Sequence, residues 1–225
     1  MLSEKNKLIE VAHVSLRYDL QPILTDINLD INRGDFMVIT GPNGGGKTSL
    51  LRIILGLLNP TKGTVRFFDD GKAVHKLNMG YLPQKNMIDS RFPITVSEVI
   101  LSGLINEKPF LRDFSREQKE QSEHIMELMG VNELRDRSIG QLSGGQLQRT
   151  LLGRAIISGP GVLVLDEPSS YVDKKFENHM YKLLADLSQK TTILLVSHEL
   201  SKVTSIANRT VYIDKTLSLI HISEP

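Results

Sequence analysis

The chain has 225 residues, of which 40% are hydrophobic and 24% charged, which is an ordinary composition for a globular protein. Its formal net charge is only +1, so the sequence does not favour nucleic-acid binding through a basic surface. It contains no cysteine, which excludes disulfides and thiolate metal sites. There is no signal-peptide core at the N-terminus and no run near the ~20 apolar residues of a membrane span, so we expect a protein that is soluble by itself.

The first third of the chain is dominated by β-strand patterns. Alternation of apolar and polar residues predicts half-exposed strands, and the continuous apolar run that begins at Phe36 predicts a buried one. The expected strands cover 8–16, 23–31, 36–40, 63–68 and 79–83. A helix over 49–55 is expected to stop before Asn59 and Pro60.

From residue 85 to about 141 the sequence predicts helices and loops without a strand. Thr95 and Glu98 form a capping box that opens a helix through Leu104. Ser115 and Gln118 form a second box, and its helix is expected to end at Gly130. We interpret residues 85–158 as a helical subdomain inserted between two parts of a core, 1–84 and 159–215.

Strands and helices alternate again after the insertion. Strands are expected over 161–166, 192–196 and 210–213, with helices from about Lys174 and about Glu199. The apolar stripe of the 174–187 helix is expected to be core. This alternation predicts an α/β fold with a mostly parallel sheet and helices on both faces. Residues 216–225 fit no pattern before them, and we treat them as a tail of uncertain origin.

The segment from Gly41 to Thr48 fits G-x-x-x-x-G-K-[ST] at every fixed position, between a predicted strand and a predicted helix. Backbone N–H groups of such a loop and the helix N-terminus form a cradle for phosphate. Lys47 is expected to reach the β- and γ-phosphates, and the Thr48 hydroxyl to ligate Mg²⁺. The alternative is a glycine-rich turn that binds nothing.

Two acidic residues follow the buried run 162–165. Asp166 stands at the carboxyl end of that strand, where α/β sheets bind ligands, and can hold Mg²⁺ opposite Thr48. Glu167 can polarise a water molecule for attack on the γ-phosphate. The alternative interpretation is that Glu167 is simply an exposed acidic residue at the end of the strand. Ser143, followed by two glycines, is a good N-cap and predicts a second helix end shaped for an anion.

In these motifs the chain resembles the ATP-binding subunits of ABC transporters, over residues 8–213. The resemblance implies an ABC ATPase of the P-loop NTPase class, with an antiparallel β part at its N-terminus, that binds ATP and Mg²⁺. It also implies that Tyr18 stacks on adenine, that Gln84 touches Mg²⁺ and water, and that His198 contacts the γ-phosphate. Tyr171 and Val172 depart from the usual Ser-Ala-Leu-Asp pattern of the dimer loop, to which Ser170 and Asp173 belong.

The expected site residues fall into four groups. The ATP-binding residues are Tyr18, Gly41, Pro42, Asn43, Gly44, Gly45, Gly46, Lys47, Thr48 and Ser49. The catalytic residues are Glu167, His198, Gln84 and Lys47, and the Mg²⁺ ligands are Thr48, Gln84 and Asp166. The residues offered to the nucleotide of a second copy are Ser143, Gly144, Gly145 and Gln146.

The resemblance implies a head-to-tail homodimer with two composite sites, bound to permease subunits at the cytoplasmic face of the membrane and working with an extracytoplasmic substrate-binding protein. The triple glycine at 44–46 and the segment 89–96 resemble the metal-ion uptake type, for zinc or manganese. Alternatives are an ABC subunit for another substrate or an exporter, a soluble ABC ATPase without a transport role, and a structural P-loop protein. Ile94, Val96, Val99 and Ile100 either line a permease groove or form the subdomain core. The remaining histidines, His13, His75, His124, His179 and His221, show no metal-ligand spacing.

Overall fold

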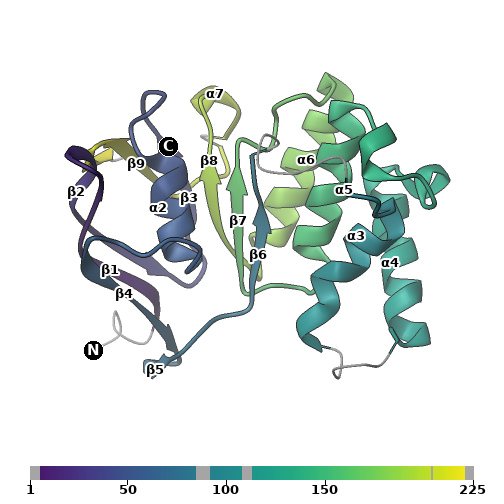
Figure 1. Cartoon of the computed structure of the whole chain (residues 1–225), viewed down its shortest axis with the longest axis horizontal. Helices are drawn as coiled ribbons and strands as arrows, with labels where there is room; N and C mark the ends of the chain where they lie inside the picture. Colours follow the sequence, from purple (N-terminus) through teal and green to yellow (C-terminus); the bar gives the residue numbers. More distant parts are fainter. Residues whose placement is uncertain (1–5, 85–91, 108–112, 204, 221–225) are drawn as a thin grey trace.

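The computed structural model describes residues 6–84, 92–107, 113–203 and 205–220 (Figure 1). Its larger sheet has six strands in the order β10-β9-β3-β8-β7-β6. All neighbouring pairs are parallel except β10 and β9, which confirms the mostly parallel sheet. The strands are β3 (Phe36–Thr40), β6 (Met79–Leu82), β7 (Val162–Asp166), β8 (Thr192–Val196), β9 (Arg209–Asp214) and β10 (Thr216–Ile220).

The smaller sheet is antiparallel and has the order β2-β1-β4-β5. Alternate residues of its two long strands are buried, as their sequence pattern predicts. The strands are β1 (Lys7–Tyr18), β2 (Gln21–Asn32), β4 (Lys62–Asp69) and β5 (Lys72–Val74).

Two strands were not expected from the sequence. The strand β5 has three residues, too few for a periodic signal, and exists as the partner of β4. The strand β10 lies in the segment that we treated as a tail, where it pairs with β9 from Thr216 to Ile220. Backbone hydrogen bonds to β9 make it an edge strand, so residues 216–220 are part of the sheet.

The helices gather mainly on one side of the large sheet, while α2 lies on the side of the smaller sheet (Figure 1). The three predicted helix starts at Thr95, Ser115 and Ser143 are confirmed, each with a complete capping box. The helix expected to run through Leu104 ends earlier and continues as a 3-10 helix, Ser102–Glu107. The α-helices are α2 (Lys47–Ile54), α3 (Val96–Leu101), α4 (Arg116–Met129), α5 (Gly144–Ile156), α6 (Lys174–Leu187) and α7 (Leu200–Val203).

Two cores flank the large sheet, one under α3–α6 and one between the sheet, α2 and the smaller sheet. Val96, Val99 and Ile100 are buried in the first, so they are core and do not line a groove for a permease. Ile94 is partly buried against the same core. Among the described residues, no helix is long and apolar enough to cross a membrane.

Candidate active site

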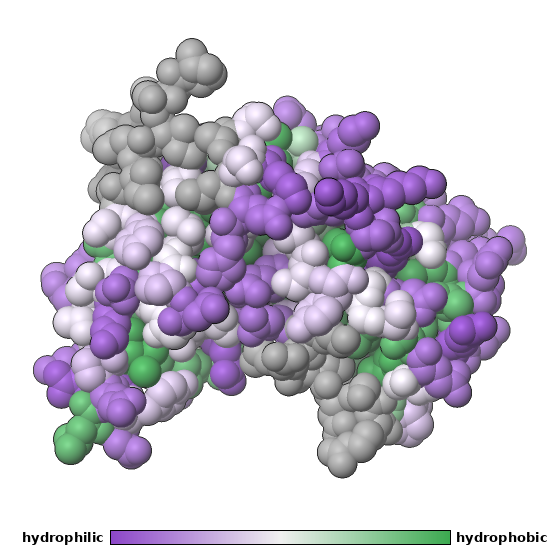
Figure 2. Space-filling model, turned by 90° about the horizontal axis from the view of Figure 1, so that it is seen from above, coloured by the Kyte–Doolittle hydropathy of each residue, from purple (hydrophilic) through white to green (hydrophobic). Residues whose placement is uncertain are grey.

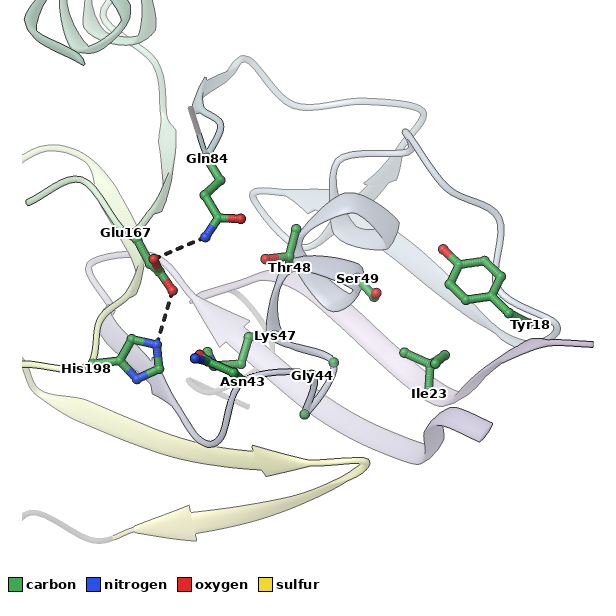
Figure 3. A pocket seen from close by; sticks show the side chains of 12 residues that line it. Tyr18, Ile23, Asn43, Gly44, Lys47, Thr48, Ser49, Gln84, Glu167 and His198 are labelled. Carbon is green, nitrogen blue, oxygen red and sulfur yellow. Dashed lines mark hydrogen bonds and ion pairs between the residues drawn. The ribbon is translucent and has the colours of Figure 1, made fainter. Parts of the chain in front are cut away.

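A cavity of about 510 Å³ opens at the carboxyl ends of the parallel strands. Figure 3 shows that its walls come from five places in the chain: the β1–β2 hairpin, the loop before α2, and the exits of β6, β7 and β8. The lining residues are Tyr18, Ile23, Asn43, Gly44, Gly45, Gly46, Lys47, Thr48, Ser49, Gln84, Glu167 and His198. The structure thus brings together most of the residues that the sequence singled out for one nucleotide.

At two positions of the loop, Gly41 and Gly46, neighbouring atoms lie so close to the backbone that only glycine fits. Gly41 has φ 142°, and a Cβ there would lie 2.0 Å from the carbonyl oxygen of Ile213. Gly46 has φ 101°, and a Cβ there would lie 2.5 Å from Leu24 Cδ2. No other residue type fits either position, which fixes the loop against β9 and β2 with its backbone turned toward the cavity.

Lys47 is buried at the start of α2, with its side chain folded along the loop. Its Nζ donates to the carbonyl oxygens of Gly41 and Pro42, both at 2.9 Å. Burial lowers the pKa of this ammonium, while the charges of Glu167 and Asp166 oppose that effect. A buried cation at a helix N-terminus, beside N–H groups of a glycine loop, is an arrangement that binds phosphate.

Thr48 and Asp166 meet at the floor of the site. The Thr48 hydroxyl donates to Asp166 Oδ2 at 2.8 Å. Asp166 is 1% exposed, and its Oδ1 is buried without a hydrogen-bond partner among the described residues. Burial is the main cause that raises the pKa of this carboxyl group.

A buried carboxylate oxygen without a donor beside a threonine hydroxyl is a fit for a hard divalent cation. The described part of the chain has no cluster of three or more His, Asp or Glu side chains that could hold a metal alone. Such a site fits an ion like Mg²⁺, which proteins usually hold through one or two carboxylates while waters and phosphate oxygens complete the coordination.

Glu167 connects three strand ends. Its Oε2 accepts a hydrogen bond from Gln84 Nε2 at 3.1 Å, and its Oε1 pairs with His198 Nε2 at 3.1 Å (Figure 3). Its backbone has φ 52°, in the left-handed region, and its N–H donates to the Val196 carbonyl at 3.1 Å. The Glu167 carboxylate, the Gln84 amide and the His198 imidazole are therefore joined by hydrogen bonds and face the loop of Lys47 together.

The structure places Ser143–Gln146 outside the cavity that Lys47 and Glu167 line. They line a second hollow of about 510 Å³, together with Gly130, Arg149, Tyr171 and Asp173. The Ser143 hydroxyl accepts from the Gln146 N–H at 3.2 Å and the Gln146 side chain caps the Ser143 N–H at 2.9 Å, so α5 begins as predicted. The two hollows share no lining residue, so the two helix starts that the sequence predicts to bind anions line different hollows of one chain.

Ser170 and Asp173, which the sequence assigns to a dimer loop, lie in the segment between β7 and α6. The Ser170 N–H donates to the Glu167 carbonyl at 3.2 Å, and the Asp173 carboxylate caps α6. Sequence analysis did not single out Ile23, which lines the nucleotide-sized cavity beside Tyr18. Its place on the hairpin partner of the Tyr18 strand is the signal that would have found it.

Comparison with known proteins agrees with this geometry. The family model described as ABC transporter matches residues 24–170. The zinc uptake system ATP-binding protein ZurA of Listeria innocua is 37% identical over 217 residues, which cover 94% of this chain and 84% of that protein. The high-affinity zinc uptake system ATP-binding protein ZnuC of Bacillus subtilis is 31% identical over 211 residues, 92% of this chain and 91% of that protein.

A solved structure with the same fold is a dimeric ATP-binding cassette in a post-hydrolysis state with ADP and phosphate. Its TM-score is 0.83 at 22% identity, covering 97% of this chain and all of that one. The family model covers more than half of the chain, and the match with ZurA covers nearly all of it. The chain therefore belongs to the ABC transporter family, as one of its ATP-hydrolysing subunits.

Proposed function

We propose that this protein powers a transporter for the uptake of zinc or manganese, and that it works as a homodimer that clamps ATP between two copies. The cargo class rests on the zinc uptake systems to which ZurA and ZnuC belong. The site rests on one observation: Gln84, Glu167 and His198 converge on the loop of Lys47.

In this proposal the glycine loop and Lys47 bind the β- and γ-phosphates of ATP. The N–H groups of Gly44–Thr48 and the start of α2 face the anion, and the Lys47 ammonium exchanges its carbonyl partners for phosphate oxygens. Tyr18, which is 49% exposed at the cavity rim, supplies a face for the adenine ring. Asn43 and Ser49 complete the lining of the phosphate end.

The unpartnered Oδ1 of Asp166, the Thr48 hydroxyl and the Gln84 side chain would hold Mg²⁺, which neutralises charge on the β- and γ-phosphate oxygens. Glu167 orients the attacking water and accepts its proton, since it is the carboxylate that reaches into the cavity. His198 holds the Glu167 carboxylate from one side and Gln84 holds it from the other, and both donors lie where the γ-phosphate is expected.

The second copy contributes its α5 helix start. Ser143, Gly144, Gly145 and Gln146 close over the γ-phosphate, so that the nucleotide is held by one copy's Lys47 and the other's Ser143. The support is the separation of the two hollows in a single chain and the dimeric form of a cassette with this fold.

The assembly that uses this motion contains membrane-spanning permease subunits, which the present chain contacts at the cytoplasmic face, and an extracytoplasmic substrate-binding protein. The support is the naming of the relatives as ATP-binding parts of uptake systems. The helical insertion, especially residues 85–111, resembles the surface that docks a permease, and within it residues 85–91 and 108–111 lie outside the described residues.

The experiment that tests the mechanism is the Glu167→Gln variant. It should bind ATP, form a stable dimer with ATP, and release phosphate about 10²–10³-fold more slowly, because the amide accepts no proton from water. Glu120→Gln, an exposed carboxylate of α4, is the matched control and should hydrolyse ATP at the wild-type rate. Near-normal turnover in Glu167→Gln would overturn the role given to this residue.

The cargo is tested separately. The protein, co-expressed with its permease partner, should support ATP-dependent uptake of radioactive zinc or manganese into proteoliposomes, and Lys47→Ala should abolish it. If neither metal is taken up while ATPase activity is intact, the proposed ATP hydrolysis would be retained and the proposed zinc or manganese cargo would be refuted.

A further inference from the structure

The short helix α7 begins two residues after His198 and carries a lysine with two acidic neighbours. Lys202 Nζ lies 2.8 Å from each carboxylate oxygen of Glu177, in the first turn of α6, and 2.5 Å from Glu199 Oε2. The Glu177 side chain is only 9% exposed, and Lys202 is its one ion-pair partner among the described residues. These contacts raise the pKa of Lys202, with the hydrogen bond to Glu177 as the largest cause, so the lysine stays charged at neutral pH.

A helix of four residues is not stable alone, so the position of α7 depends on what it touches. Val203 is buried in the core under α3–α6, and Lys202 supplies the ionic contacts. Figure 2 looks onto the face at the carboxyl ends of the strands, where α7 lies, and outside the grey atoms that face is mostly hydrophilic with small separate apolar patches. The ion pair between Lys202 and Glu177 is therefore a main contact that fixes α7 against α6.

The position of α7 matters for His198, because that residue lies on the short connection between β8 and α7. The upstream end of this connection is fixed, since Ser197 is buried and its N–H donates to the Ile39 carbonyl at 3.2 Å. The His198 side chain is 45% exposed, and its hydrogen-bond partner among the described residues is the Glu167 carboxylate. One hydrogen bond does not fix an imidazole ring, so the direction of the ring also depends on how α7 holds the downstream end.

We propose that Lys202 and Glu177 are a positioning pair for ATP hydrolysis: their ion pair holds α7 against α6 and thereby keeps the His198 imidazole on the Glu167 carboxylate. This rests on the proposed function, in which His198 holds Glu167 while that carboxylate orients the attacking water. The pair joins the two chain segments that carry these side chains, because α6 follows the loop of Glu167 and α7 follows the loop of His198. Neither Lys202 nor Glu177 lines the cavity, so their effect on the reaction passes through His198.

An ion pair of this kind can also serve stability alone, and the two roles differ in what they predict. Removing the lysine leaves the nearly buried Glu177 carboxylate without its cation, which destabilises the fold. Replacing both residues by neutral ones of similar size removes that penalty, but it also removes the link between α6 and α7. A purely structural pair therefore predicts a wild-type ATPase rate for the double variant, whereas a positioning pair predicts a slow one.

The test compares Lys202→Met, Lys202→Arg and Glu177→Gln,Lys202→Met by phosphate release with saturating Mg²⁺-ATP, at a temperature well below every Tm. Lys202→Met should lower Tm by about 4 °C or more and kcat about tenfold or more, because a displacement of about 1 Å at a reacting centre can cost about 10²-fold in rate. The double variant should recover Tm but not kcat. Lys202→Arg should keep both, since a guanidinium pairs well with a carboxylate. Lys182→Met, on the exposed face of α6, is the matched control and should change neither.

A second comparison asks whether the pair acts through His198. In single-turnover hydrolysis, Lys202→Met should cost little further rate on a His198→Ala background, and ATP affinity, measured by titration with a fluorescent analogue, should be unchanged in every variant. A wild-type kcat in the double variant, or an equal loss from Lys202→Met with and without His198, would overturn the positioning pair and leave the proposed function intact. Wild-type hydrolysis by His198→Ala would overturn both the pair and the part that the proposed function gives to His198.

Discussion

Asp166 combines burial with an oxygen that has no hydrogen-bond partner in the described part of the chain. Burial is the largest cause of its raised pKa, Glu167 adds to the effect, and the Thr48 hydroxyl and Lys47 oppose it. Because the folded-state pKa lies above the unfolded value, the folded protein binds this proton more tightly than the unfolded chain does. The contribution of Asp166 to stability is therefore largest at low pH and falls as the pH rises through the folded-state pKa.

Asp166→Asn should therefore stabilise the metal-free protein at pH 7 while abolishing hydrolysis. Removing the buried charge should raise Tm in EDTA by about 2–4 °C, and this gain should shrink as the pH falls through the folded-state pKa toward the unfolded value, below which both states are protonated. Thermal unfolding from pH 4.5 to 8 measures it. Asp186→Asn, on the exposed face of α6, should leave Tm unchanged at every pH. A lower Tm of Asp166→Asn at pH 7 would show that the carboxylate is stabilised by its surroundings.

Tyr18 stands half exposed at the rim of the cavity, next to Ile23. If its ring stacks on adenine, Tyr18→Ala should weaken ATP binding about tenfold, because stacking of a base on an aromatic ring is worth about 1–3 kcal/mol. Tyr18→Phe should bind as the wild type does. Equilibrium titration with a fluorescent ATP analogue checks both, and Tyr212→Ala, another exposed tyrosine outside the cavity, is the control. Equal losses in alanine and phenylalanine would point to the hydroxyl group and refute stacking.

At the scale of elements, three helices begin with the same device. Thr95, Ser115 and Ser143 each cap their helix and receive a side chain from three residues on. A cap of this kind is worth about 1 kcal/mol to stability, whatever else the helix does. Since only α5 begins at a hollow proposed to meet a nucleotide, the three caps allow stability and function to be separated.

Ser115→Ala and Ser143→Ala should each lower Tm by about 2–4 °C, through the loss of equivalent caps. Ser143→Ala should in addition lower the ATPase rate at saturating ATP about tenfold or more, since it removes a donor aimed at the γ-phosphate of the other copy. Phosphate release, measured at a temperature well below the Tm of both variants, separates an effect on catalysis from an effect on stability. Equal ATPase rates in the two variants would mean that the Ser143 hydroxyl only caps α5.

The sequence predicted the elements whose signals are local. The strands β3, β7 and β8 are apolar runs buried along their whole length, and the two predicted capping boxes and the predicted N-cap Ser143 mark helix starts to the residue. The strands β5 and β10 could not be predicted, because each exists through pairing with a neighbour. The ambiguity over Val96, Val99 and Ile100 had the same origin: an apolar helix face fits a core and a docking groove equally well until its neighbours are known.

For the site, the motifs predicted the residue types and their roles in binding but not their contacts. Glu167, Gln84 and His198 are far apart in the sequence, and nothing local in it indicates that one carboxylate joins the other two. Nor does any sequence pattern show that Asp166 keeps an unpartnered oxygen, which depends on burial by the whole sheet.

At the scale of the whole molecule, the two helix starts proposed to bind anions, those of α2 and α5, line different hollows of the same chain. A composite site needs Lys47 from one copy and Ser143 from the other, whereas a site within one chain would need both from the same copy. These two arrangements predict opposite results when two inactive variants are mixed.

Lys47→Ala and Ser143→Ala should each hydrolyse ATP poorly alone, and an equimolar mixture should regain up to about a quarter of wild-type activity. Random pairing makes half of the dimers mixed, and each mixed dimer combines both defects in one site and leaves the other site complete. Phosphate release at fixed total protein measures the recovery, with Lys47→Ala plus Lys47→Ala,Ser143→Ala as the control mixture that contains no complete site. Activity equal to the average of the separate variants would show that Lys47 and Ser143 never act on the same nucleotide from two copies, because only pairing across the interface can rebuild a site that neither variant has.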